Sequence, residues 1–110
     1  MGLGGYDVTT YFASGPIKGS EQHVIDHRGS KMCFVTDENK ELFLKNPEGY
    51  MPQFDGQCSF ALSLGKVETG NPKHWRVSEG KLFLNSNPVA GFLFKIIPGR
   101  VEAAKKNFGG

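Results

Sequence analysis

The stretch from Asp37 to Cys58 constrains the fold most, because it joins a short amphipathic helix to a proline-rich turn. Thr36 or Asp37 is suited to cap the start of that helix, and apolar residues then recur along one side of it. Pro47 and Pro52 end the helix. The pattern predicts a short helix followed by a turn that leads to a cysteine.

Cys58 stands after this turn, at the predicted start of a second short helix over Ser59 to Leu64. The unpaired N–H groups and the positive dipole end at such a position stabilise a thiolate. Cys58 is therefore the first candidate for a functional residue.

The composition describes one globular domain over residues 1–110. Nine Phe, three Tyr and one Trp supply material for a core, and fifteen Gly with six Pro predict many turns. The formal charge is +2 with Lys and Arg spread along the chain, which argues against a nucleic-acid partner. No apolar run reaches the ~18 residues of a membrane span. We find no internal repeat in the sequence and no export signal.

Short strands and short helices are predicted in mixed order, which indicates a small α+β fold of β-hairpins with a central helix and C-terminal helices. Residues 6–12 are predicted as a strand, and residues 71–75 as a turn or short helical start. Two hairpins are predicted about Arg28-Gly29 and Glu79-Gly80. The chain is expected to end in two helices, Val89 to Ile97 and Arg100 to Phe108, separated by Pro98-Gly99.

The first hairpin has a predicted register that places candidate ligands. If Arg28 and Gly29 form the loop, the pairs are 27 with 30, 26 with 31, 25 with 32, 24 with 33 and 23 with 34. His23, His27 and Met32 then share one face of the hairpin, whereas Cys33 points to the other.

Several short motifs, in order along nearly the whole chain, resemble the YHS-domain family in its longer stand-alone bacterial form. The opening Gly4-Gly5-Tyr6-Asp7-Val8 with Tyr11-Phe12 is similar to the family's GGYDVVAYF. The other matching residues are Gly29, Phe34, Asn39, Phe43, Asn46-Pro47, Tyr50, Pro52-Gln53, Gly56, Cys58, Pro72, Trp75, Gly80-Lys81-Leu82, Leu84-Asn85, Ile97-Pro98-Gly99 and Phe108.

This resemblance implies an α+β fold and a copper-related protein that is exported or periplasmic, with a cytoplasmic location left open. Shorter relatives, related to TRASH-like metal-binding domains, carry a YFCSxxC motif. In this chain Val35 and Asn39 occupy its two cysteine places, so that motif is absent. Asp55 and Gln57 also depart from the family's pattern beside Cys58.

A soft-metal site is the first functional hypothesis. Thiolate, thioether and imidazole together suit Cu(I), so the candidate ligands are Cys58, His23, His27 and Met32. Ordinary strand and core positions explain the histidines and the methionine equally well.

Two other roles stay open for the thiols. Cys33 and Cys58 are a candidate disulfide pair, and Cys58 is a candidate reactive thiol with His74 or His23 as its base. No nucleophile elbow, phosphate loop or paired-carboxylate motif accompanies it, so we expect a protein without enzymatic activity.

An assembly module without a metal is the alternative. Phe92, Leu93 and Phe94 are consecutive, so they cannot all point inward from one helix. The helix from Val89 to Ile97 is a candidate homodimer contact, and the Trp75 region is another candidate surface.

Overall fold

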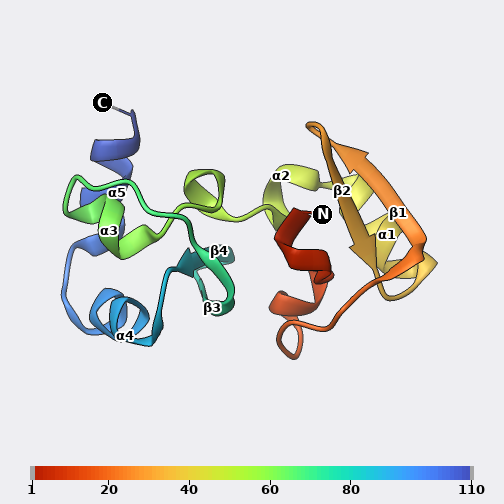
Figure 1. Cartoon of the computed structure of the whole chain (residues 1–110), viewed down its shortest axis with the longest axis horizontal. Coiled ribbons are helices and arrows are strands. Elements are labelled where there is room, and N and C mark those ends of the chain that lie inside the picture. The colour runs from red at the N-terminus through yellow and green to blue at the C-terminus, as the bar shows by residue number, and fades with distance from the viewer. Residues whose placement is uncertain (1, 110) are drawn as a thin grey trace. The chain divides into compact units, whose positions relative to one another are not determined.

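The computed structural model describes residues 2–109 and divides the chain into two compact units, Met1–Met51 and Pro52–Gly110, here called the N-unit and the C-unit. The sequence predicts one domain over residues 1–110, and both units lie within it. The predicted α+β fold is confirmed, because each unit combines an antiparallel β-hairpin with short helices (Figure 1).

The N-unit is built around the hairpin of β1 (Ser20–His27) and β2 (Ser30–Phe34), with α1 packed alongside it (Figure 1). The other elements, in chain order, are the 3-10 turns η1 (Gly2–Gly5) and η2 (Val8–Phe12) and the helices α1 (Asp37–Lys45) and α2 (Pro47–Tyr50). Thr36 caps α1 by accepting a hydrogen bond from Asn39 N at 3.1 Å.

The C-unit contains the hairpin of β3 (Asn71–Ser78) and β4 (Lys81–Asn85). Its other elements are η3 (Gln53–Gly56), α3 (Ser59–Ser63), α4 (Pro88–Ile96) and α5 (Arg100–Gly109). Phe54, Leu62, Phe83, Phe94 and Ala104 form its buried cluster. Among the described residues, no helix has both the length and the apolar character that a bilayer crossing requires.

Two predicted elements are wrong. Residues 6–12 do not form a strand, because the Asp7 side chain accepts a hydrogen bond from Thr9 N at 2.9 Å and starts the 3-10 turn η2 instead. Residues 71–75 are not a turn but the first part of β3, which pairs with β4.

The predicted register of the first hairpin is confirmed for the four pairs nearest its loop. The fifth pair, His23 with Phe34, is wrong. Phe34 pairs with Ser20, because a β-bulge between Ser20 and Val24 inserts extra residues into β1.

The two units repeat the same architecture at a constant spacing of 51 residues. The helix α1 (Asp37–Lys45) matches α4 (Pro88–Ile96), and every pair of the first hairpin, including its bulge, has a counterpart 51 positions later in the second. The left-handed turns match as well, with φ of 52° at Arg28 and 52° at Glu79. The structure therefore contains an internal repeat, which corrects the conclusion from sequence.

Few residues are identical between the two copies of this repeat. Seven matched positions hold the same residue in both units: 5 and 56, 19 and 70, 23 and 74, 29 and 80, 42 and 93, 43 and 94, and 47 and 98. Four of the seven are glycine or proline, so the identities mark backbone requirements more than shared chemistry.

Gly19 and Gly70 are matched positions where the backbone passes too close for a side chain. A Cβ atom on Gly19 would lie 2.5 Å from the carbonyl carbon of Cys33, and one on Gly70 would collide with the carbonyl oxygen of Gly56. Gly91, in the middle of α4, has nothing near its own Cβ position.

We predict that Gly70→Ala lowers the free energy of unfolding by about 1–3 kcal/mol, because backbone atoms must move to admit the methyl group. Urea denaturation followed by circular dichroism measures it. Gly91→Ala is the control, and it should raise stability by about 0.5–1 kcal/mol because alanine favours the helix. A Gly70→Ala protein as stable as the wild type would contradict the close approach.

Candidate functional site

The four candidate metal ligands are divided between the two units. His23, His27 and Met32 belong to the N-unit, and Cys58 belongs to the C-unit. Three of the four therefore lie on the first hairpin, while the thiol belongs to the other unit.

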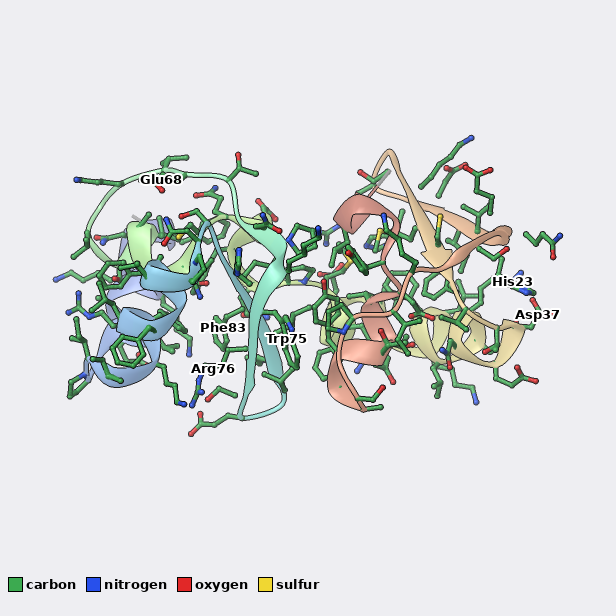
Figure 2. All side chains as sticks on the ribbon, turned by 60° about the horizontal axis from the view of Figure 1, so that its bottom comes forward. His23, Asp37, Glu68, Trp75, Arg76 and Phe83 are labelled. Carbon is green, nitrogen blue, oxygen red and sulfur yellow. The ribbon has the colours of Figure 1, made fainter. Side chains whose placement is uncertain are left out.

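Of the two histidines of the N-unit, His23 has a polar partner, whereas the buried Nε2 atom of His27 has no hydrogen-bond partner among the described residues. His23 Nδ1 lies 2.8 Å from Asp37 Oδ1, at the start of α1 (Figure 2). His27 packs edge-on against the Phe43 ring at 5.2 Å, and its Nε2 lies 3.7 Å from Glu48 Oε1, beyond hydrogen-bond distance. These contacts fit the structural role that strand histidines commonly have.

Met32 and Cys33 are core residues of the N-unit, each 1% exposed. The thioether of Met32 packs closely on the backbone of Gly2, since a Cβ atom there would lie 2.5 Å from Met32 Sδ. Cys33 and Cys58 are both buried, and neither forms a disulfide.

Cys58 stands directly before α3, as predicted, and is fully buried. Its sulfur does not cap the helix. Asn85 does so instead, because its Oδ1 accepts a hydrogen bond from Phe60 N at 2.9 Å and lies 3.7 Å from Cys58 Sγ. The N–H group expected to stabilise a thiolate is thus already paired with an amide.

Asp7 occupies the matching position in the N-unit and makes a complete buried network. One carboxylate oxygen accepts from Thr9 N at 2.9 Å and from the Thr9 hydroxyl at 2.7 Å. The other accepts from Val35 N at 2.8 Å and from Asn39 Nδ2 at 3.0 Å. This carboxylate therefore ties η2 to the segment that leads into α1.

A cavity of about 350 Å³ lies beside Cys58 in the C-unit. Ala90 lines it at the position that matches Asn39, whose amide reaches Asp7 in the N-unit. The methyl group of Ala90 fills less space than the amide side chain of Asn39 does in the N-unit. The other lining residues are Phe60, Ala61, Leu64, Lys66, Glu68, Ser86, Asn87, Val89 and Leu93.

The lining of this cavity offers few ligands for a soft metal. The described residues that line the cavity include one sulfur ligand and no histidine or methionine. Among all the described residues, no group of three or more His, Cys, Asp and Glu side chains could hold a metal ion. The soft-metal hypothesis accordingly stays a prediction.

The sequence analysis names Asp7 and Asn85 only as motif residues and gives them no role, although both are buried polar residues that organise their units. Asp7 carried a usable signal, because an aspartate followed two residues later by threonine is a common capping pattern. Asn85 lies in an apolar strand, and its role depends on a contact with Phe60 that no local pattern predicts.

No family model matches the chain, and the searches of curated proteins and of solved structures also give no match. The resemblance to the YHS-domain family consequently stays a prediction that depends on the motifs in the sequence.

The copper hypothesis predicts that reduced protein binds Cu(I) tightly and that Cys58→Ser weakens this binding at least about tenfold, because the thiolate is the softest proposed ligand. Titration against a Cu(I) chelator measures it. Cys33→Ser is the control, since it removes the other buried thiol. Equal affinity in the wild type and in Cys58→Ser would contradict the assignment.

We also predict that Asp7→Ala lowers the free energy of unfolding by about 3 kcal/mol or more, because several buried donors lose their acceptor. Asp26→Ala, at an exposed position of β1, should change it by less than about 0.5 kcal/mol. Urea denaturation compares the two variants. Equal effects would show that the buried network contributes little.

Proposed function

We propose that this chain is a non-enzymatic interaction module that associates with a second copy of itself through the outer face of α4. The support is a stripe of exposed apolar side chains, Val89, Phe92 and Ile96, which are 67%, 59% and 52% exposed. Their spacing of three and four residues puts them on one side of the helix.

The inner face of α4 packs against the core of the C-unit. Ala90 and Phe94 are buried, and the Phe94 ring packs against Phe83 at 5.3 Å. The exposure of Phe92 beside the buried Phe94 agrees with the expectation that three consecutive apolar residues cannot all point inward.

The matching helix of the N-unit provides the comparison that carries the proposal. Its three corresponding positions hold Glu38, Glu41 and Lys45, which are all exposed. The same fold therefore accepts charged residues at these places. The fold does not require the apolar residues at these positions of the C-unit, so their presence indicates a contact surface.

A second copy is the occupant that the stripe itself favours. Phe92 lies at the centre of α4, with Val89 one turn before it and Ile96 one turn after it. In an antiparallel pair with twofold symmetry, the Phe92 side chains meet, and Val89 of each copy lies opposite Ile96 of the other. Antiparallel pairing also brings opposite ends of the two helix dipoles together.

We predict a concentration-dependent dimer that Phe92→Glu weakens at least about tenfold, because it places two carboxylates at the centre of the contact. Sedimentation equilibrium over a range of concentrations measures the dissociation constant. Thermal melting confirms that the variant remains folded, which we expect since Phe92 contributes an exposed side chain.

Glu41→Gln is the matched control, since it changes the charge at the corresponding position of α1. We expect it to leave the dissociation constant unchanged. A wild-type protein that stays monomeric at millimolar concentration would refute the proposal, and so would a dimer that Phe92→Glu does not weaken.

A further inference from the structure

A second cavity of the C-unit, of about 480 Å³, lies where α4 packs against β3. Four of its lining residues are basic: Lys73, His74, Arg76 and Lys95. No acidic residue is among the lining residues that the structure describes. None of these four side chains makes an ion pair within the described part of the chain.

The N-unit fills the corresponding place with its own carboxylate. There Asp37 lies 2.8 Å from His23 and 3.7 Å from Lys40 Nζ, so an anion sits between two basic groups. The C-unit keeps the histidine as His74, but Pro88 replaces Asp37 and Gly91 replaces Lys40. The carboxylate is therefore lost where the histidine is retained.

Three other replacements add positive charge, and Gly91 adds space. Lys73, Arg76 and Lys95 stand at the positions of Gln22, Ile25 and Leu44 in the N-unit. Gly91 leaves open space beside α4, since nothing lies within 4 Å of its Cβ position. A pocket of this volume falls in the range that holds small-molecule ligands.

The net charge also differs between the two units, and the C-unit is the more basic one. The N-unit has five Lys and Arg against seven Asp and Glu, a formal charge of −2, whereas the C-unit has eight against four, a formal charge of +4. The overall +2 therefore conceals a basic C-unit, although the cations look evenly spread in the sequence.

Arg76 and Lys95 line two cavities of the C-unit. The other of these two cavities, of about 350 Å³, is also lined by Arg100, which has a buried Nε atom without a hydrogen-bond partner, and by the acidic residues Glu79 and Glu102. Arg76 extends from the opposite side of β3 from Trp75 (Figure 2). A guanidinium group beside an ammonium group is suited to carboxylate and phosphate oxygens.

We infer that the cavity lined by Lys73, His74, Arg76 and Lys95 binds a small multivalent oxyanion, a phosphorylated or polycarboxylated metabolite, in place of the carboxylate that Asp37 supplies in the N-unit. The ligand oxygens provide the negative charge that the C-unit lacks at this position. The inference is independent of self-association, because the stripe of α4 contributes no residue to this cavity.

Titration with sodium pyrophosphate and with sodium citrate, at constant ionic strength and followed by amide NMR shifts, tests the site with both oxyanion chemistries. We expect at least one of them to shift residues 73–76 and 95 saturably. Arg76→Gln and Lys95→Gln should each weaken that binding at least about fivefold, because charged hydrogen bonds are lost. Lys95 lies outside the hairpin, so its variant serves if Arg76→Gln unfolds.

Pro88→Asp provides a sharper variant, because it restores the internal carboxylate at a helix position where Asp37 is already accepted in the N-unit. It should abolish oxyanion binding while the fold is retained. Lys106→Gln is the control, since Lys106 lines neither cavity and carries the same charge in the same unit. We expect it to bind like the wild type.

The inference is overturned if neither oxyanion shifts these residues, or if Lys106→Gln weakens binding as much as Arg76→Gln and Lys95→Gln do. Retained affinity in Pro88→Asp would also overturn it. Repeating the titration in the Phe92→Glu background separates this site from self-association, because binding should persist there even if the dimer is lost.

Discussion

Backbone hydrogen bonds between the start of each unit and the residues just before its first strand are the constraint on which the rest of the architecture depends. Asp7 N donates to Ile17 O at 2.8 Å and Gly19 N to Gly5 O at 2.9 Å. The C-unit repeats both bonds, from Cys58 N to Glu68 O at 2.8 Å and from Gly70 N to Gly56 O at 3.0 Å. These bonds use main-chain atoms alone, so they tolerate nearly any side chain provided that glycine stays at the close approach.

This dependence on the backbone explains how much of the fold the sequence predicts. Turn residues and helix caps act locally. The sequence therefore predicts the turns at Arg28-Gly29 and Glu79-Gly80 and the cap at Thr36. The two hairpins and the helices are predicted from these signals. The sequence does not predict the repeat, because its matching elements share few identical residues. The strand predicted over residues 6–12 failed because β-branched and aromatic residues suggested a strand, whereas the Asp7 side chain decided the conformation.

The candidate sites are less predictable than the fold, for a physical reason. Residue type and helical spacing are local properties, so the sequence could single out Cys58 as a candidate and predict an exposed apolar residue on the helix from Val89 to Ile97. The cavities depend on absent atoms, such as the amide that Ala90 lacks and the carboxylate that Pro88 lacks. A missing side-chain group can be recognised only by comparison with the matching position of the other unit, where the group is present.

The strained turn at Phe54 brings the start of the C-unit into contact with its last helix. Phe54 has φ of 60°, a left-handed conformation that is costly for an aromatic residue, and its ring packs against Phe108 at 5.6 Å, near the end of α5. Asn107 also donates to Leu62 O at 2.7 Å. The C-unit thus has contacts of high sequence separation between its first and last elements. During synthesis it cannot complete its core until its final helix has left the ribosome, whereas the N-unit is already whole by then.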